Sequence, residues 1–382
     1  GCVYAGATVG AWYPITPSTS LMDSFQAFCK QLRKCDETEK NNFCIIQAED
    51  ELAAIGMVLG ASWNGARAFT PTSGPGISLM SEFIGFAYYS ELPAVIFDIQ
   101  RTGPSTGMPT RTQQCDLMIC AYASHGDTKH PLLFPSNPEE CFYMTQAAFD
   151  LADELQTPVF MMSDLDIGMN DWMCPDLKWD ETYRPKRGKV LNAEQLESME
   201  KFHRYLDVDG DGIPYRTLPG EHAKGSFFTR GSGHNKYGAY TEDGEEYQDV
   251  VDRLLLKWET ARVMMPQAII NSSEFNKTAI ISYGSSDGAA KEALERLKQQ
   301  NKNYNYCCVK AFPFNDSIKD FIANHDKIFI VEQNRDAQMR SLLILDLEID
   351  PKKLISILHY NGNPIHADFI VDAVVKNEQK GV

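Results

Sequence analysis

The first 165 residues alternate between short apolar runs and longer stretches that are rich in small residues. The apolar runs have the composition of buried strands and lie at residues 43–47, 68–71, 94–99 and 158–162. The stretches between them have the composition of helices and lie at residues 51–63, 77–89 and 137–155. Consecutive parallel strands need a crossover, which is usually a helix. The alternation therefore predicts an α/β domain over residues 1–165, with a mainly parallel sheet covered by helices on both faces.

This alternation stops near residue 166 and resumes near residue 271. Residues 166–270 contain Trp, Pro and Gly-rich stretches, so we expect an irregular excursion that ends in a linker helix at 249–263. Residues 271–382 are expected to form a second α/β domain. Its strands are predicted at residues 278–282, 306–309 and 327–331, and its helices at residues 287–300, 317–324 and 336–345.

Charge and cysteine content narrow the class of protein. The 382 residues include 52 acidic and 36 basic side chains, and the net charge of −16 argues against nucleic acid as a partner. No run of about 18 apolar residues is present, which argues against a membrane partner. The ten cysteines form no Cys-x-x-Cys pair, so we expect reduced thiols, no metal site in this chain and a cytoplasmic location.

The first residues, 1–6, show neither an initiator Met nor the pattern of a signal peptide. Their small side chains are typical of a helix. We therefore expect the chain to begin inside a helical pattern and a further segment to precede it.

The segment Tyr13–Ser18 has the sequence YPITPS and is the first candidate binding loop. Its two prolines restrict the backbone of a short turn that carries three hydroxyl groups. Pro17 and Ser18 are also typical of a helix start. The pattern alone therefore fits either a ligand-binding loop or a capped helix.

An acidic triplet, Glu49, Asp50 and Glu51, stands at the junction of a predicted strand and a predicted helix. The structural interpretation is that carboxylates stabilise a helix N-terminus by about 0.3–1 kcal/mol each. Glu51 differs because a face of small residues follows it, at Ala53–Gly60. A carboxylate beside such a face can keep a proton and bond the nitrogen of a heterocycle. Glu51 is therefore the candidate catalytic residue.

Arg101 directly follows the predicted strand 94–99, in the sequence QRTGPSTGMPT. Ligands of open α/β sheets bind beyond the carboxyl ends of strands, and Arg can hold a carboxylate with two hydrogen bonds. The alternative is a surface turn with a solvated Arg. Hydroxyl groups follow at Thr102, Ser105, Thr106 and Thr110.

The segment 207–212, with the sequence DVDGDG, resembles the start of a calcium-binding EF-hand loop, but position 12 would be Leu218 instead of Glu. A cation site and a polar turn both remain open. The same glycines, with Asn235 downstream, imitate the diphosphate–magnesium motif of thiamine enzymes, although no apolar strand precedes them.

Taken together, these segments resemble the α subunit of the 2-oxoacid:ferredoxin oxidoreductases, and within that family the 2-oxoglutarate (2-oxoglutarate synthase) branch. The resemblance implies that residues 1–165 form the pyrimidine-binding-like domain of a thiamine-diphosphate enzyme, and residues 271–382 a transketolase C-terminal-like domain. The matching segments are YPITPS at Tyr13–Ser18, QAEDELAAIG at Gln47–Gly56, FTPTSGPGISLMSE at Phe69–Glu82, QRTGPSTGMPT at Gln100–Thr110, DGIPYRTLPG at Asp211–Gly220 and VEQN at Val331–Asn334.

The resemblance also implies a reaction. It is the oxidative decarboxylation of 2-oxoglutarate to succinyl-CoA and CO₂, or the reverse carboxylation, with thiamine diphosphate and coenzyme A. By motif position, Glu51 bonds the aminopyrimidine N1′ of the cofactor, and Pro14 and Ile15 lie beside the cofactor. Arg101 binds the 1-carboxylate of the substrate, and Thr16 lies near the substrate.

We further expect Thr102, Ser105 and Thr106 to contact the substrate, with Ser105 and Thr106 near a distal carboxylate. Electrons would pass through [4Fe–4S] clusters to ferredoxin. The resemblance assigns these clusters and Mg²⁺ to a β subunit that shares the thiamine diphosphate site, so this chain alone would be inactive. A γ-type domain upstream and a second αβ pair are also implied.

Three alternatives remain open at this point. The chain could act on another 2-oxoacid, such as pyruvate or a branched-chain acid. It could be a non-catalytic scaffold subunit of such a complex. It could also be a self-sufficient thiamine enzyme that binds a cation in the region between Gly210 and Asn235.

Overall fold

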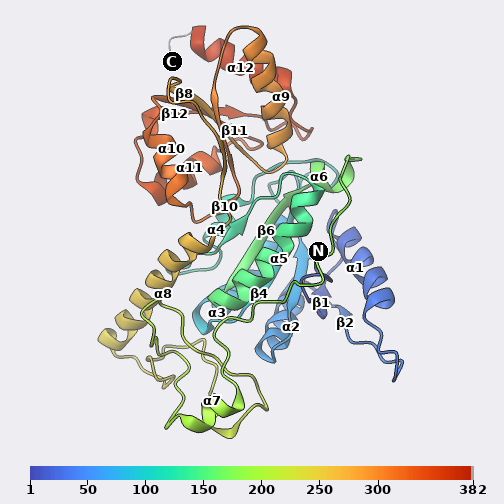
Figure 1. Cartoon of the computed structure of the whole chain (residues 1–382), viewed down its shortest axis with the longest axis vertical. Helices are drawn as coiled ribbons and strands as arrows, with labels where there is room; N and C mark the ends of the chain where they lie inside the picture. The colour runs from blue at the N-terminus through green and yellow to red at the C-terminus, as the bar shows by residue number, and fades with distance from the viewer. Residues whose placement is uncertain (380–382) are drawn as a thin grey trace.

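The computed structural model describes residues 1–379, and a seven-stranded sheet lies at the centre of its N-terminal part (Figure 1). The strand order is β10-β5-β6-β4-β3-β1-β2. All neighbours are parallel except β10, which is antiparallel to β5. The predicted α/β fold with mainly parallel strands is therefore confirmed. The strands are β1 (Val9–Trp12), β2 (Cys44–Gln47), β3 (Ala68–Thr72), β4 (Ala94–Gln100), β5 (Leu132–Leu133), β6 (Pro158–Asp164) and β10 (Ala311–Phe312).

Helices cover both faces of this sheet, because side chains of successive strand residues point into two separate apolar cores. One core includes residues of α2 (Glu51–Trp63), α3 (Gly74–Ser90) and α4 (Leu117–Ala121). The other includes residues of α1 (Thr19–Leu32) and α5 (Pro138–Leu155).

Local sequence explains where these helices begin. α2 has the predicted bounds because the Asp50 side chain caps it, accepting a hydrogen bond from the backbone N–H of Ala53 at 2.7 Å. α3 begins at Gly74, before the predicted start at residue 77. Pro75 lies in its first turn, where the fixed φ of proline suits a helix and its missing N–H leaves no bond unmade.

One expectation about the start of the chain is wrong, and one strand there was not predicted. Residues 1–6 do not belong to a helix, and Val9–Trp12 forms β1 between β2 and β3. Gly10 and Ala11 hide this strand, because they give it no β-branched signal. Residues 43–47 were expected to be a buried strand, but β2 is an edge strand with Cys44 and Gln47 exposed.

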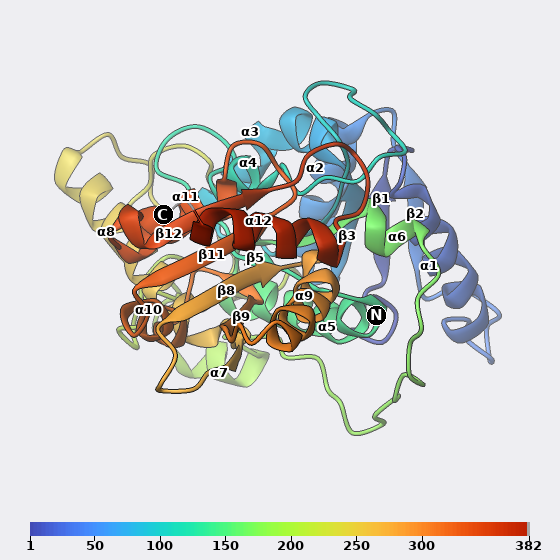
Figure 2. The same cartoon turned by 90° about the horizontal axis from the view of Figure 1, so that it is seen from above.

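A five-stranded sheet forms the C-terminal unit, in the order β12-β11-β8-β9-β7, and only β7 runs antiparallel to its neighbour. Figure 2 shows β12, β11, β8 and β9 of this sheet from above. β12 and α12 were not predicted. The strands are β7 (Ile269–Asn271), β8 (Thr278–Tyr283), β9 (Asn305–Val309), β11 (Lys327–Glu332) and β12 (Leu354–Leu358). The helices are α9 (Ser286–Gln299), α10 (Asp316–Ala323), α11 (Gln338–Leu347) and α12 (Ala367–Gln379).

Figure 1 shows this unit over one end of the seven-stranded sheet and the loops of the excursion at the other end. The predicted helix at 249–263 lies within the longer α8. The regular elements of the excursion are α6 (Leu165–Met169), α7 (Ala193–Ser198), the short 3₁₀ helix Ala223–Gly225 and α8 (Gly244–Met264). None of the described helices has the length and apolar character needed to cross a membrane.

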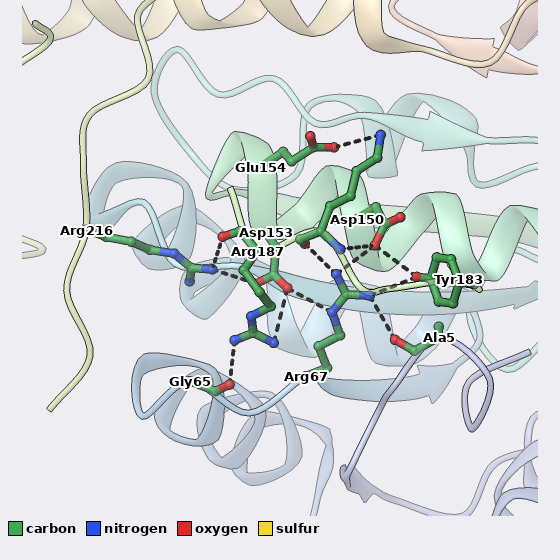
Figure 3. Close-up of polar contacts among 10 residues, drawn as sticks. Ala5, Gly65, Arg67, Asp150, Asp153, Glu154, Tyr183, Arg187 and Arg216 are labelled. Atoms are coloured by element: carbon green, nitrogen blue, oxygen red, sulfur yellow. Dashed lines mark hydrogen bonds and ion pairs between the residues drawn. The ribbon is translucent and has the colours of Figure 1, made fainter. Parts of the chain in front are cut away.

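A buried ion cluster around Arg67 fastens the excursion to the first sheet (Figure 3). Arg67 is only 4 % exposed and pairs with Asp150 at 2.7 Å and with Asp153 at 2.9 Å, both on α5. From the excursion, Arg216 pairs with Asp153 at 2.8 Å, and the Tyr183 hydroxyl donates to Asp150 at 3.0 Å. We call this the Arg67 anchor.

A second cluster holds α8. Glu91, at the end of α3, is fully buried and pairs with Arg253 at 2.5 Å and with Lys257 at 2.8 Å. Burial disfavours its charge, but the two cations outweigh burial and hold the pKa of Glu91 well below its ordinary value.

A buried polar network joins the two sheets at the carboxyl ends of β4 and β6. Gln114 donates to the carbonyl of Tyr283 at 3.2 Å, and its side-chain oxygen accepts from Ser286 and from the backbone N–H of Gln333, each at 3.2 Å. Ser285 donates to Asp164 at 2.5 Å. This network fixes the C-terminal unit over the strand ends where the candidate site lies.

Candidate active site

Loops that follow β1, β2, β3 and β4 meet at one edge of the first sheet. The chain moves from β1 to β2 on one side and then to β3 on the other side of β1, so the winding direction switches there. Ligands of open α/β sheets bind outside the carboxyl ends of the strands at such a switch point. The fold therefore gathers the sequence-predicted segments, which are Tyr13–Ser18, Glu49–Glu51, Ser73–Gly76 and Arg101–Thr110.

Glu51 is the first residue of α2 and differs from its acidic neighbours. Glu49 and Asp50 are exposed, and Asp50 supplies the helix cap, whereas Glu51 is only 5 % exposed. Among the residues that the structure describes, no group donates a hydrogen bond to its carboxylate. A carboxylate withdrawn from water without a donor is unfavourable, so the geometry suits a ligand that brings one.

The first turn of α3 packs against Glu51. A Cβ at Gly76 would lie 1.9 Å from Thr72 Oγ1 and 2.9 Å from Glu51 Cγ, so no larger residue fits at this position. The hydroxyl of Ser73, which precedes this helix, is buried without a hydrogen-bond partner among the described residues. The Gly-Pro-Gly turn therefore brings backbone directly beside Glu51.

Arg101 connects the loops that follow β1 and β4. It is 6 % exposed, and it donates from Nη1 to the carbonyl of Thr16 at 2.7 Å and from Nη2 to the carbonyl of Thr106 at 3.1 Å. Its Nε is buried without a partner, and Arg101 forms no ion pair with the described residues. The guanidinium is thus held in place but has unused donor capacity, which is what a carboxylate ligand requires.

A cavity of about 580 Å³ opens beside Arg101, between the two α/β units. This volume is in the range of small-molecule sites. Arg101 and Arg335 are the cations of its lining. The first unit contributes Gly74, Pro75, Ser78, Arg101–Ser105, Gln113, Cys115, Asp116 and Ile119, and the second unit contributes Asn334–Asp336, Gln338 and Tyr360.

The hydroxyl residues after Arg101 have different surroundings. Thr102 lines the cavity, but its Oγ1 donates to the backbone carbonyls of Arg111 and Thr112 at 3.1 and 3.2 Å. Ser105 is exposed, lines the cavity and has a positive φ of 59°. Thr106 is exposed and does not line the cavity.

The loop after β1 approaches Arg101 without lining the cavity. Pro14 and Thr16 are exposed, and Ile15 is half-buried. The structure therefore brings Thr16, Arg101 and Thr106 together, while Glu51 lies on the other side of the α3 turn and also does not line the cavity.

Sequence reasoning missed the contribution of the second unit. Asn334 is buried and donates to the carbonyl of Gln114 at 3.0 Å, which holds the adjacent Arg335 at the cavity. The Arg335 side chain is 72 % exposed and pairs with Asp336 at 2.8 Å. The available signal was that Arg335 directly follows the VEQN segment and the end of a strand.

The glycine-rich loop at 207–212 is occupied by a cation of the chain itself. Lys189 Nζ lies 2.7 Å from Asp209 and 2.8 Å from Asp211, while Asp207 accepts backbone N–H groups of the loop. Asn235 bonds Glu246 at 3.1 Å. The geometry favours the polar turn. Within residues 1–379, no group of three or more His, Cys, Asp and Glu side chains is arranged to hold a metal ion.

The N-terminal part of the chain matches a known domain family. Residues 1–204 match the thiamine-diphosphate-binding domain of the pyruvate flavodoxin/ferredoxin oxidoreductases. This match, together with the switch-point site, defines the class as an α/β protein with a thiamine-diphosphate-binding domain.

Similar whole chains identify the family more closely. The α subunit of 2-oxoacid:ferredoxin oxidoreductase from Saccharolobus solfataricus is 32 % identical over 391 residues, which cover 100 % of this chain and 60 % of that relative. The 2-oxoglutarate synthase subunit KorA from Methanocaldococcus jannaschii is 33 % identical over 334 residues, covering 83 % of this chain and 81 % of KorA. The chain belongs to the family of 2-oxoacid:ferredoxin oxidoreductase α subunits. It spans about 60 % of the length of the first of these relatives.

Solved structures agree with this membership. The 2-oxoglutarate:ferredoxin oxidoreductase from Magnetococcus marinus, solved with 2-oxoglutarate, coenzyme A and succinyl-CoA, superposes with a TM-score of 0.89 at 27 % identity, covering 98 % of this chain and 63 % of that one. A split-gene transketolase shares the fold alone, with a TM-score of 0.51 at 12 % identity, covering 96 % of this chain and 91 % of that one.

Proposed function

We propose that this chain is the α subunit of a 2-oxoglutarate:ferredoxin oxidoreductase. The reaction joins the acyl group of 2-oxoglutarate to coenzyme A, releases CO₂ and passes the electron pair to ferredoxin, or runs in reverse. One observation carries the proposal: two incompletely bonded charges lie at the same switch point. Glu51 is a buried carboxylate that accepts no hydrogen bond from the described residues, and Arg101 is a buried guanidinium with an unused donor.

The surroundings of Glu51 fit the ring end of thiamine diphosphate. A buried carboxylate that lacks a donor and faces a turn without side chains is complementary to a flat heterocycle with a ring nitrogen. We assign this contact to Glu51, with Pro14 and Ile15 of the neighbouring loop beside the ring. When bound, thiamine diphosphate supplies the carbon nucleophile that a 2-oxoacid needs in order to lose CO₂. Glu51 holds or moves the proton at the ring nitrogen.

Arg101 is assigned to the 1-carboxylate of the substrate. Its bonds to the carbonyls of Thr16 and Thr106 fix the guanidinium, and Nε remains free to donate. Thr16 stands beside the substrate, and Thr102 supports the loop through its bonds to backbone carbonyls.

A substrate with two carboxylates needs a second cationic partner, and Arg335 lines the same cavity. Its existing partner, Asp336, is an exposed neighbour in the sequence, and such exposed pairs are weak enough to yield to a ligand carboxylate. We therefore assign the distal carboxylate to Arg335, with a hydroxyl bond from Ser105, while Thr106, which does not line the cavity, supports Arg101 through its carbonyl. This arrangement favours a diacid over pyruvate.

The partners follow from the same proposal. A β subunit completes the cofactor site and carries Mg²⁺ and the [4Fe–4S] cluster, and ferredoxin and coenzyme A are the co-substrates. A γ-type domain and a second αβ pair complete the assembly. A broader 2-oxoacid specificity is the second candidate, because relatives named for 2-oxoacids in general are as similar as the KorA proteins.

The test is ferredoxin reduction by the chain assembled with its β subunit, thiamine diphosphate and coenzyme A, with 2-oxoglutarate compared with pyruvate. We expect a preference for 2-oxoglutarate and, for Glu51→Gln, a loss of about 10²–10⁴-fold in turnover with the fold intact. The matched control is Glu49→Gln, which changes an exposed member of the same triplet. Near-normal turnover of Glu51→Gln would overturn the catalytic assignment, and a preference for pyruvate would overturn the substrate.

A further inference from the structure

Two carboxyl groups face one another under the cavity and play no part in the function proposed above. Asp98, on β4, is fully buried, and Asp116, just before α4, lines the cavity. Their side chains are close enough to share a hydrogen bond. Asp98 Oδ1 and Asp116 Oδ2 are buried oxygens for which no described residue supplies a donor. One proton between the two groups gives both oxygens a partner.

Physical chemistry decides which group holds that proton. Two buried carboxyls in contact cannot both ionise at neutral pH. Burial, together with repulsion from Asp116, raises the pKa of Asp98 well above its ordinary value. Burial raises the pKa of Asp116 to about 6, and hydrogen bonds and the Arg101 charge limit this rise. At neutral pH, the proton therefore stays on Asp98, which donates a hydrogen bond to ionised Asp116.

Three titratable or charged groups face this pair. Cys120 Sγ lies 3.7 Å from Asp98 Oδ2, and Cys115 Sγ lies 3.6 Å from Asp116 Oδ1. Burial, reinforced by the carboxyls, raises the pKa of both thiols, so both stay protonated. The Cys120 thiol donates to Asp98, and the single proton of the Cys115 thiol serves either Asp116 or the Arg101 carbonyl, which lies 3.4 Å away. Arg101 is the cation that acts on Asp116. The first turn of α3 closes the remaining side, since a Cβ at Gly74 would lie 2.8 Å from both Asp116 oxygens.

The charge of Asp116 compensates the buried positive charge of Arg101. A buried guanidinium needs a counter-charge, yet Arg101 has only carbonyl partners and forms no ion pair with the described residues. Asp116 lines the same cavity, and the Cys115 thiol lies between it and the Arg101 carbonyl, so its negative charge acts on Arg101 without occupying the guanidinium donors. Those donors remain available for a ligand carboxylate, which Asp116 also repels.

We propose that Asp98 is a proton-holding donor that keeps Asp116 ionised as the counter-charge of Arg101, so that Asp116 is a positioning residue that sets the affinity of Arg101 for a 2-oxoacid. This proposal rests on the proposed function, because it takes a 2-oxoacid as the ligand of Arg101. It adds that protonation of Asp116 strengthens substrate binding and that Asp98 fixes the pH at which this happens.

The first experiment measures the KM for 2-oxoglutarate against pH in the assembled enzyme. In the wild type, KM should fall several-fold as the pH drops through about 6. Asp116→Asn should abolish this transition and give a low KM at every pH, with a smaller effect on kcat. Asp98→Ala removes the donor to Asp116, so the transition should move to higher pH by about one unit. Asp98→Asn should restore it, because the amide donates the same bond.

Asp166→Asn is the matched control. Burial also raises the pKa of Asp166 to about 6, but Asp166 does not line the cavity, so its replacement should leave the KM transition where the wild type has it. A transition that survives Asp116→Asn, or that Asp98→Ala does not move, overturns the proposal, because a merely structural pair would change stability without moving this pH profile.

A second measurement is independent of turnover. Infrared difference spectra of the assembled protein at neutral pH should show a protonated carboxyl band that is lost in Asp98→Asn and kept in Asp166→Asn. Absence of this band overturns the proton-holding pair whatever the activity is. If the band is present but no 2-oxoacid binds or reacts, the proposed function fails and the Asp116 role falls with it, while the shared proton stands.

Discussion

The Arg67 anchor and the cavity each contain a buried arginine, and the two arginines differ in how completely they are bonded. Arg67 and Arg101 are 4 % and 6 % exposed. The Arg67 guanidinium donates hydrogen bonds to Asp150 and Asp153, to two backbone carbonyls and to a tyrosine hydroxyl (Figure 3). Arg101 has two carbonyl partners, and its Nε has no partner among the described residues.

This difference separates two uses of buried charge. A charge whose partners all belong to the chain is saturated and can only hold the fold together. A charged group with an unused donor has lost hydration without a replacement bond, and a ligand that accepts from this donor recovers part of that free energy. Neither burial nor a single unused donor distinguishes a structural arginine from a binding arginine, because Nε of Arg216 and of Arg253 is also buried without a partner. Arg216 and Arg253 form ion pairs, whereas Arg101 forms none with the described residues and lines a cavity.

Breaking the anchor should give the largest change in stability. Arg67→Met leaves Asp150 and Asp153 buried with fewer cations, which should lower the free energy of unfolding by about 3–5 kcal/mol. Arg184→Met, which removes an exposed arginine of the same excursion that bonds only nearby carbonyls, should change it by about 0.5 kcal/mol or less. Denaturant unfolding of both variants checks this. Equal effects would mean that saturation does not mark a structural charge.

Asp166 sharpens the comparison, because it is a buried carboxyl without a cation that lies outside the cavity. Its folded-state pKa of about 6 exceeds the unfolded value of about 3.9, so the folded chain binds more protons between these values. Stability must therefore fall as the pH rises from 4 to 6. Asp166→Asn cannot ionise, so its unfolding free energy relative to the wild type should rise by about 2 kcal/mol over this window.

Thermal melting of both proteins from pH 4 to 7 measures this difference. A constant difference across the window would show that Asp166 does not titrate with folding. A rising difference would show that a buried carboxyl without a cation, bonded by the Asn170 amide, takes up a proton on folding and does not need a ligand.

The anchor and the cavity also differ in how well the sequence predicts them. The bounds of α2 follow from local signals, namely the Asp50 cap and the Asn64–Gly65 stop, and Arg101 is marked by its place after a strand. β1 escaped prediction because its small residues carry no strand signal, although its central place in the sheet creates the switch point. Long-range contacts have no local pattern, so neither the Arg67–Asp150 pair nor the approach of Arg335 to the cavity could be predicted.

Arg335 tests the cavity side of the comparison. If its exposed pair with Asp336 yields to a distal carboxylate, Arg335→Gln should raise the KM for 2-oxoglutarate by about tenfold and leave the KM for pyruvate unchanged. Arg111→Gln, an exposed arginine of the adjacent loop that does not line the cavity, is the control. An equal rise for both substrates would instead place Arg335 in binding of coenzyme A or of a protein partner.

The smallest effect concerns backbone strain beside that residue. Ala337, just before α11, has a φ of +52°, a conformation that costs an L-residue with a Cβ about 1 kcal/mol. Ala337→Gly should therefore raise the free energy of unfolding by about 1 kcal/mol or less, since glycine also gains freedom in the unfolded chain. Ala373→Gly, inside α12, should lower it by about 1 kcal/mol, and chemical denaturation of the two variants should show opposite signs. If Ala337→Gly also raises the KM for 2-oxoglutarate, the strain helps to hold Arg335 at the cavity. If only stability changes, Asn334 and its bond to Gln114 suffice to place Arg335 at the cavity.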